Sequence, residues 1–460
     1  MVGLPGFEPG TSCTPSKRAS QAAPQPESTS LHSLFSPSRS DNLYPMRLAR
    51  IAALALISAL ATTAQSPFYL QEGDRVVFYG DSITDQRLYT TFVESFIVTR
   101  FPHMNVAFTH SGWGGDRVSG GGGGPIDVRL ARDVFPYRPT VMTIMLGMND
   151  GNYKAFDEGT FTSYKAGMEH ILDSVAKSAP NCRITLIQPS PYDDVTRAPL
   201  FEGGYNAVLL RFSDYLAGLA RARHLDLADL NAPVNAMLTK ASAVDKEQAQ
   251  RILPDRVHPA AAGHIIMAEA LLKAWKAPAV VSDVEIDAAT GATHPTNAKV
   301  DNLKTGSQIS WTETESALPM PIEPRDKLLD FALKSSDFVD ALDRETLRVK
   351  GLTAATYELK IDGATVGRFS NDDLTKGVNL ATLNTPMLRQ SLDVHALTMK
   401  HNNMHFAKWR TVETGLSNDA SPATKLDAME ALDRLDNELV AEQRAAAQPK
   451  AHTFELIPAQ

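Results

Sequence analysis

The chain has 460 residues and a formal net charge of −8; 43% of its residues are hydrophobic and 21% are charged. This balance is ordinary for a globular protein with a sizeable core, and the length allows roughly two or three domains. No basic stripe runs through the sequence, so nucleic acid is not expected as a partner, because phosphate binding needs clustered Lys and Arg.

The first 64 residues have the pattern of an unstructured extension followed by a secretory signal. Residues 1–45 are rich in Pro, Ser and Gly and have no apolar period, which predicts disorder. In residues 46–64, Arg47 and Arg50 precede an apolar run that ends in small residues, as in signal peptides. We therefore expect Met46 to be the initiator, residues 1–45 to be a gene-model extension, and the mature protein to be secreted or periplasmic without stable membrane insertion. A buried helix or an uncleaved anchor is the alternative.

The cysteines do not indicate a disulfide framework or a zinc site. Cys13 and Cys182 are the only two, and no Cys/His cluster has the spacing of zinc ligands. Without the N-terminal segment, Cys182 stands alone. Its surroundings, "PNCRITL", favour the start of a buried strand over a reactive thiol.

Short apolar runs alternate with longer amphipathic runs over residues 66–278. They predict strands and helices in turn: 75–79, 85–99 (helix), 105–110, 126–135 (helix), 139–147, 160–178 (helix), 182–189, 205–223 (helix), 225–230 and 260–276 (helix). Nearly continuous apolar strands separated by helices predict a parallel sheet covered on both faces. Such sheets bind ligands beyond the carboxyl ends of their strands.

The pattern changes after Pro278, and residues 281–460 are expected to form a smaller mixed β/α region packed on the first domain. Residues 280–316 are polar and rich in Thr, without a clear period. Residues 344–370 contain two predicted strands and an "IDG" turn, which indicate a hairpin or meander that residues 373–384 continue. Helical spacing of Leu, Met and Ala over residues 424–447 predicts a surface helix.

The tripeptide Gly80-Asp81-Ser82 follows the first predicted strand directly. Ser82 is thereby expected at the carboxyl edge of the sheet, where the start of a helix favours negative charge. A serine becomes a nucleophile only beside a positioned base. The stretch differs from the G-x-S-x-G elbow of α/β-hydrolases, because Thr84 stands at a glycine position. Taken alone, the tripeptide is equally consistent with an ordinary turn.

A base and its partner precede the last predicted helix of this domain. Asp255 comes three residues before His258, so its carboxylate can fold back to accept a hydrogen bond from Nδ1–H and leave Nε2 free to take a proton. The alternative is that Asp255 caps the helix and His258 is an ordinary loop residue.

Two further stretches offer donors for a developing oxyanion. Gly115 in "SGWGGDR" follows the second predicted strand, and a glycine allows its backbone N–H to approach a ligand closely. Asn149 in "MLGMND" follows the third strand and carries a side-chain amide. A glycine turn and a helix cap are the plainer interpretations. All these groups nevertheless lie in loops that a parallel sheet brings to one rim.

Four sequence blocks resemble the SGNH, or GDSL, hydrolase family in that family's order: "GDS" with Ser82, "GGD" with Gly115, "GMND" with Asn149, and "DRVH" with Asp255 and His258. The resemblance spans roughly residues 70–277. It implies a three-layer, flavodoxin-like α/β fold and ester hydrolysis without metal or organic cofactor. It further implies that Ser82 is the nucleophile, that Asp255 orients the base His258, and that the oxyanion hole comprises Gly115, Asn149 and the N–H of Ser82.

The chain departs from this family in the loop after Gly115. The run "GGGGGP" at Gly120–Pro125 lengthens that loop and is expected to make it flexible beside the site. The shape of the substrate therefore stays open.

Four histidines outside the blocks have plainer roles. His264 is expected to pack on its helix, and His110 to end a strand without reaching the site. His401 and His405, in "HNNMHF", are expected on the surface.

Two acids and two aromatic residues adjoin the blocks. Asp81 and Asp150 are expected to hold loops by hydrogen bonds rather than to carry protons. Trp113 and Tyr153 are candidates for the wall of a sugar or acyl pocket.

These features together predict an exported serine esterase whose substrate is a small-molecule or carbohydrate ester, with acetyl groups on carbohydrate as the first choice. Two alternatives stay open. One is an O-acyltransferase with the same triad, and the other is a carbohydrate-binding protein that has lost catalysis. The sequence leaves the oligomeric state open.

Overall fold

The structure is a computed structural model that describes residues 68–416 and 421–459. The predicted extension at 1–45 and the signal at 46–64 lie outside these residues. Within the described ranges, no helix has both the length and the hydropathy that crossing a membrane requires.

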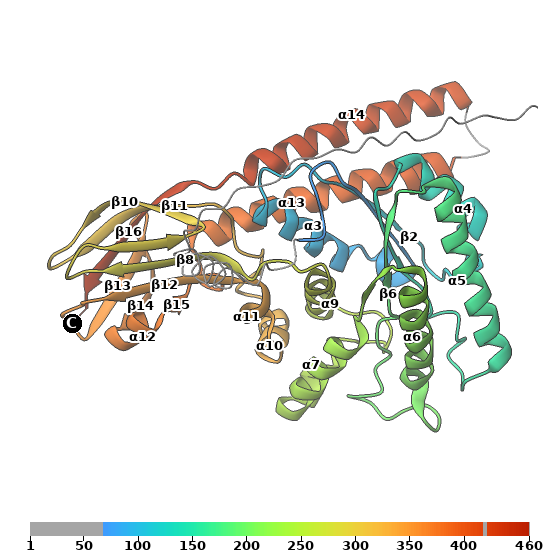
Figure 1. The fold of residues 1–460 in the computed structure, drawn as a ribbon, viewed down its shortest axis with the longest axis horizontal. Helices are drawn as coiled ribbons and strands as arrows, with labels where there is room; N and C mark the ends of the chain where they lie inside the picture. Colours follow the sequence, from blue (N-terminus) through green and yellow to red (C-terminus); the bar gives the residue numbers. More distant parts are fainter. Residues whose placement is uncertain (1–67, 417–420, 460) are drawn as a thin grey trace, which may run out of the picture. The chain divides into compact units, whose positions relative to one another are not determined.

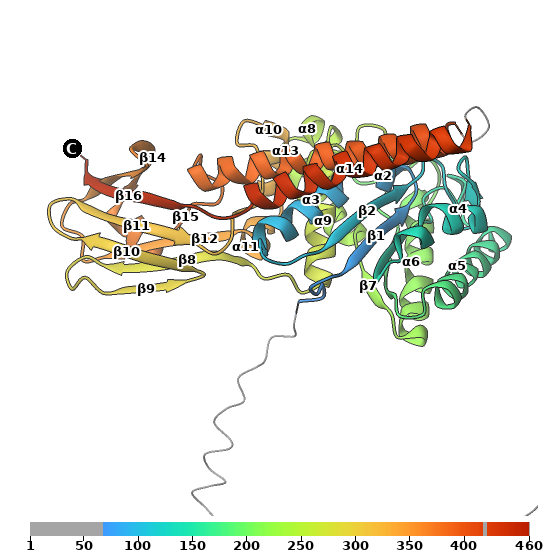
Figure 2. The ribbon, with the colours of Figure 1, turned by 90° about the horizontal axis from the view of Figure 1, so that it is seen from above.

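Five parallel strands form the central sheet of the first domain (Figures 1 and 2). In spatial order they are β2 (Ala107–Gly112), β1 (Arg75–Gly80), β5 (Val141–Met145), β6 (Arg183–Ile187) and β7 (Asp226–Ala228). Numbered along the chain, this order is 2-1-3-4-5, which is the flavodoxin-like arrangement. Every residue of β5 is buried, which explains its continuous apolar run. The predicted parallel sheet and three-layer fold are confirmed.

Helices cover both faces of this sheet. Helices α3 (Leu88–Arg100) and α9 (Ala261–Ala274) pack together on one face, while α4 (Ile126–Asp133), α5 (Glu158–Ser178) and α6 (Gly204–Arg223) lie on the other (Figures 1 and 2). The chain leaves β1 for β2 on one side and then crosses to β5 on the other. The carboxyl ends of β1 and β5 therefore flank the switch point where such sheets bind ligands.

The structure differs from the predicted helices of this domain in two places. The helix expected at 85–99 begins later, as α3 at Leu88, because Arg87 adopts a left-handed conformation with φ of 59°, and Asp85 instead ends the short helix α2 (Ser82–Asp85). Helices α7 (Asn231–Val244) and α8 (Lys246–Gln250) were not predicted.

The C-terminal region contains two further sheets. One is antiparallel, in the order β10 (Ala298–Lys304), β11 (Ile309–Glu315), β16 (Ala451–Pro458), β13 (Thr356–Ile361) and β14 (Ala364–Ser370). The other is β15 (Val378–Asn379), β12 (Arg344–Lys350), β8 (Val280–Asp287) and β9 (Thr293–Thr296). Side chains from both sheets share one hydrophobic core, so the region is a β-sandwich.

The structure corrects the sequence interpretation of this region in part. The hairpin with the "IDG" turn is confirmed as β13–β14. However, β12 pairs in the other sheet, so residues 344–370 do not form a meander. Residues 280–316, predicted to lack a period, form four strands. The expected continuation at 373–384 is wrong in its first part, because a capping box between Ser370 and Asp373 begins helix α12 (Asn371–Lys376).

Two helical segments connect the sandwich to the first domain. Helices α10 (Lys327–Lys334) and α11 (Phe338–Leu342) pack on α9. Helix α13 (Pro386–Phe406) packs on α3 and on strand β2, continues into the π-helix η2 (Ala407–Thr414), and is followed by α14 (Pro422–Ala446). Helices α13 and α14 lie side by side (Figures 1 and 2). The predicted helix at 424–447 is thereby confirmed as α14.

Candidate active site

Ser82 is the first residue of α2, directly beyond the carboxyl end of β1. The buried carboxylate of Asp81 caps this helix by accepting the N–H of Ile83 at 3.0 Å. Two glycines let the short helix lie against the sheet. A Cβ on Gly80 would be 2.3 Å from Thr84 Oγ1, and one on Gly112 would be 2.2 Å from the backbone nitrogen of Asp85. The tight turn therefore presents Ser82 at the rim.

The loop before α9 brings an imidazole and a carboxylate to this serine. His258 Nε2 lies 2.8 Å from Ser82 Oγ, and His258 Nδ1 lies 2.7 Å from Asp255 Oδ2. An ionised carboxylate accepts hydrogen bonds and cannot donate them. Nδ1 of His258 therefore carries the proton toward Asp255, and Nε2 accepts the hydrogen bond from the Ser82 hydroxyl. The structure thus brings Ser82 together with His258, which lies 176 positions further along the chain, and with Asp255, three residues before His258.

Hydrogen bonds keep Asp255 ionised. Its Oδ1 accepts the backbone N–H groups of Val257 and His258, at 2.9 and 2.7 Å. Burial alone would raise the pKa of Asp255, but these donors and the His258 ring outweigh it, so the pKa lies below its usual value. The carboxylate stays charged and can fix the imidazole.

An arginine that the sequence did not suggest holds this loop. The guanidinium of Arg197 donates to the carbonyl oxygens of Leu253 at 2.8 Å and of Gln250 at 3.0 Å, and it pairs with the buried Asp193. Because Arg197 lies in an irregular segment, 56 residues before Leu253, no local pattern links it to the loop.

The two predicted oxyanion donors lie in the loops after β2 and β5. Gly115 has a φ of 76°, a left-handed conformation that favours glycine, and among the described residues its N–H has no backbone acceptor. Asn149 donates from Nδ2 to the carbonyl oxygen of Asp116 at 3.0 Å. Its Oδ1 accepts the hydroxyl of Tyr153 at 2.8 Å, which fixes the orientation of the amide. One hydrogen of Nδ2 is left over after these bonds.

Two buried acids support the same loops, as predicted. Asp81 caps α2, and Asp150 Oδ1 accepts the N–H of Val118 at 3.0 Å. Burial is the main cause that raises the pKa of Asp81 to about 7 and that of Asp150 to about 6.

The structure places His264 and His110 inside the domain. His264 is fully buried and stacks on Tyr89, and burial lowers its pKa to about 3. It is packed on its helix, as expected. His110 is bonded at Nδ1 to Thr90 and at Nε2 to Glu94, so both of its ring nitrogens are occupied within the core.

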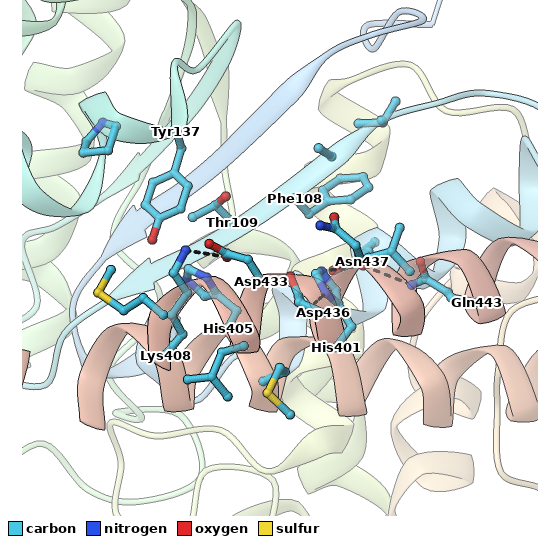
Figure 3. A pocket seen from close by; sticks show the side chains of 18 of the residues that line it. Phe108, Thr109, Tyr137, His401, His405, Lys408, Asp433, Asp436, Asn437 and Gln443 are labelled. Atoms are coloured by element: carbon cyan, nitrogen blue, oxygen red, sulfur yellow. Dashed lines mark hydrogen bonds and ion pairs between the residues drawn. The ribbon is translucent and has the colours of Figure 1, made fainter. Parts of the chain in front are cut away.

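The prediction of a surface position for His401 and His405 is wrong. Both are buried on α13, with 6% and 8% of their surface exposed. They line a cavity of about 520 Å³ that α13, α14 and the outer edge of β2 enclose (Figure 3). His401 Nδ1 bonds Asp436 at 2.6 Å. None of the five predicted site residues lines this cavity.

The two aromatic candidates differ in their surroundings. Tyr153 is 40% exposed, holds Asn149 and packs near Tyr192 and Tyr205, so it lies at the rim. Trp113 instead packs against Trp409 and Arg410 of η2.

The glycine run after Gly115 forms a short β-ladder rather than the flexible loop that we expected. Strands β3 (Gly120–Gly121) and β4 (Gly124–Pro125) pair in antiparallel fashion. A Cβ on Gly123 would lie 2.6 Å from the ring of Trp113, so the missing side chains let the run pack on this tryptophan.

No group of three or more His, Cys, Asp or Glu side chains in the described part of the chain is arranged to hold a metal ion. Cys182 lies directly before β6, and burial raises the pKa of its thiol to about 12.

Part of the chain is similar to known proteins. The model of the GDSL-like lipase/acylhydrolase family matches residues 78–266. An acetylxylan esterase from Geobacillus stearothermophilus is 22% identical over 222 residues, which are 44% of this chain and 93% of that protein. The solved structure of a gut microbial diltiazem-metabolizing enzyme is 25% identical, with a TM-score of 0.73, and the match covers 86% of this chain and 100% of that one. The likeness to the latter therefore includes the C-terminal region.

Proposed function

We propose that Ser82, His258 and Asp255 are the catalytic triad of a carboxylic ester hydrolase, since residues 78–266 match the model of the GDSL-like lipase/acylhydrolase family. The observation that carries the proposal is the 2.8 Å separation of His258 Nε2 and Ser82 Oγ, with Asp255 bonded to the other ring nitrogen. This continuous chain of hydrogen bonds is what a serine needs to be activated.

The proposed reaction has two halves. Ser82 Oγ attacks the ester carbonyl carbon while His258 Nε2 takes the hydroxyl proton. The tetrahedral intermediate expels the alcohol, which leaves with that proton from His258. Water then attacks the acyl-enzyme, with His258 again as base, and the carboxylic acid is released. Asp255 keeps Nδ1 protonated and stabilises the imidazolium at each step.

The oxyanion of each intermediate is assigned to three donors. The N–H of Gly115 has no backbone acceptor among the described residues, and Asn149 Nδ2 has one hydrogen left over. The N–H of Ser82, at the first position of α2, is the third donor. Each donor of this kind contributes roughly 3 kcal/mol to transition-state stabilisation.

Steady-state hydrolysis of 4-nitrophenyl acetate tests the triad. Ser82→Ala and His258→Gln are each expected to lower kcat by roughly 10³-fold or more, whereas the control Ser163→Ala, at an exposed serine of α5, keeps the wild-type rate. Wild-type activity in Ser82→Ala would overturn the proposal.

For the substrate, we propose short acyl groups on carbohydrate. The acetylxylan esterase relative supports this choice, as does the exposure of the rim at Tyr153 and His258. Acetate release from acetylated xylo-oligosaccharides should exceed hydrolysis of longer acyl esters. A rate that rises with acyl length would contradict the proposal, and transfer of the acyl group to an added sugar would identify a transferase instead.

For the location, we propose export with cleavage after residue 64, from the basic, apolar and small-residue pattern of residues 46–64. N-terminal sequencing of the protein from culture medium or periplasm is expected to find a start close to Gln65. A mature start far from it would contradict this assignment.

A further inference from the structure

The C-terminal region reaches the loop that carries Gly115 through the π-helical segment η2. Its Trp409 is buried, and the indole N–H donates to Asp133 Oδ1 at 2.6 Å. π-Helical turns are rare and are found frequently at functional sites. The next residue along η2 is Arg410, and its contacts lie beside the proposed catalytic groups.

The guanidinium of Arg410 contacts three parts of the site's framework. Its central carbon lies 3.5 Å from the ring centroid of Trp113, a close cation–π contact. Its Nη1 lies 3.5 Å from Asp85 Oδ1 and 3.4 Å from the carbonyl oxygen of Gly112. Arg410 therefore bridges helix α2 and the end of strand β2.

Asp85 carries this contact on to the turn. Its second oxygen, Oδ2, accepts the backbone N–H of Gly114 at 3.1 Å. Gly114 precedes Gly115, and Asp85 comes three residues after Ser82. Trp113 is tied as well, since its N–H donates to the carbonyl oxygen of Gly80 at 3.0 Å. One guanidinium thus acts on both sides of the turn that presents the Gly115 N–H.

The segment that supplies Arg410 is firmly attached to the first domain. Arg87, between α2 and α3, donates to the carbonyl oxygen of Asn402 and to Asn403 Oδ1, both at 3.1 Å. The guanidinium of Arg87 also lies 4.3 Å from the ring centroid of Phe406. The backbone that carries Arg410 is therefore fixed to the first domain, and Arg410 is not a freely moving side chain on the surface.

We propose that Arg410 is a positioning residue for ester hydrolysis, which holds Asp85 and Trp113 so that the Gly112–Gly115 turn keeps its oxyanion donor in place. This inference rests on the proposed function of Ser82 and Gly115. In this proposal the C-terminal region takes part in catalysis, because the hydrolase domain depends on η2 for the side chain that holds Asp85 and Trp113. Arg410 itself does not touch the reacting atoms.

The test compares Arg410→Ala and Arg410→Lys with wild type in the full-length protein, on 4-nitrophenyl acetate. A misplaced donor weakens transition-state binding more than substrate binding. Arg410→Ala should thus lower kcat by about 10- to 100-fold with KM changed less than about twofold. Arg410→Lys keeps the positive charge facing Asp85 but loses the planar guanidinium over Trp113. Its kcat should therefore lie between those of wild type and Arg410→Ala.

Chemical rescue by added guanidinium distinguishes a positioning role from a general structural role, because free guanidinium can replace the missing side-chain group but cannot repair a destabilised fold. At low millimolar concentration it should restore part of kcat in Arg410→Ala and leave wild type unchanged. The control is Arg325→Ala, which removes an exposed arginine paired with Glu323 and should show neither loss nor rescue. If Arg410→Ala does not fold, Arg410→Lys decides the question, since its melting temperature should be close to wild type.

Several outcomes would overturn the inference. One is a kcat within twofold of wild type in Arg410→Ala, or in Arg410→Lys where only that variant folds. Another is a kcat of Arg410→Ala that added guanidinium raises no more than it raises that of Arg325→Ala. Ser82→Ala in the same assay separates this failure from that of the proposed function. An inactive Ser82→Ala beside fully active Arg410 variants removes only the positioning role, whereas an active Ser82→Ala removes the triad itself.

Discussion

Four carboxyl groups are buried in and beside the β-sandwich, and they predict that the protein loses stability as the pH rises from acidic to weakly alkaline values. Glu313 and Glu315 lie on β11 and Glu345 lies on β12, while Asp343 directly precedes β12. None of the four residues is more than 6% exposed. Arg100 at the end of α3 lies 3.5 Å from Asp343, and Ser282 donates to Glu315 Oε1 at 2.6 Å.

Burial is the main cause of the high pKa values in this cluster. It raises the pKa of Glu315 from 4.5 to about 8, with the charge of Glu313 as a second cause. A raised carboxyl pKa means that the folded state holds its proton more tightly than the unfolded chain. The associated stability is therefore fully present below pH 4.5 and is lost as the pH rises through 8. At about 1.4 kcal/mol per unit, the loss for Glu315 is on the order of 5 kcal/mol.

Glu315→Gln removes this titration while it keeps the shape of the side chain. The melting temperatures of the variant and of wild type are measured by calorimetry from pH 5 to pH 9. As the pH rises, that of wild type should fall relative to that of the variant, by roughly 2–4 °C for each kcal/mol of unfolding free energy that wild type loses. The control Glu358→Gln changes a half-buried glutamate of β13, whose pKa the hydrogen bond from Thr365 holds below its usual value, so this variant should follow wild type across the same range. Parallel curves for Glu315→Gln and wild type across this range would refute the reasoning.

Three further predictions concern the site itself. Asn149→Ala should lower kcat for 4-nitrophenyl acetate by about 10²- to 10³-fold with little change in KM, since it removes one oxyanion donor; an unchanged kcat would take Asn149 out of the oxyanion hole. Tyr153→Phe should lower kcat by about tenfold, because a hydrogen bond of about 1.4 kcal/mol no longer fixes the Asn149 amide; in the same assay, a changed KM with constant kcat would instead indicate a substrate contact. Gly112→Ala should lower both activity and melting temperature, because its Cβ would meet the backbone of Asp85 at 2.2 Å; full activity would show that α2 can shift without cost.

The first domain was predictable because its strands are buried on both faces. Continuous apolar runs such as Val141–Met145 leave few alternatives, and the parallel arrangement then brings the loops after β1, β2 and β5 to one rim. The convergence of Ser82, His258 and Asp255 followed from this topology.

The C-terminal strands were missed because acids occupy inward positions. In β11, Ile309, Trp311, Glu313 and Glu315 alternate as buried residues, so half of the inward side chains are carboxylic acids and the apolar period disappears. The partners that make this burial tolerable, such as Ser282 and Arg100, lie in other segments.

Helix α13 was missed for a related reason. Its buried residues include Ser391, Thr398, His401 and His405, which recur at helical spacing but are polar. Their partners lie in other segments: His401 pairs with Asp436 of α14 and with Glu94 of α3, and Ser391 donates to the carbonyl oxygen of Pro319. A hydrophobic period cannot reveal a helix whose buried face is polar, and the same limit hid the contact of Arg410 with Asp85.

The most direct measurement of the central claim is peptide mapping after brief exposure to a fluorophosphonate, which forms a stable ester with an activated serine. We predict loss of esterase activity in step with modification of a single peptide, the one that contains Ser82, and no labelling in Ser82→Ala. Loss of activity while Ser82 stays unmodified, or with the label on another serine, would contradict the account.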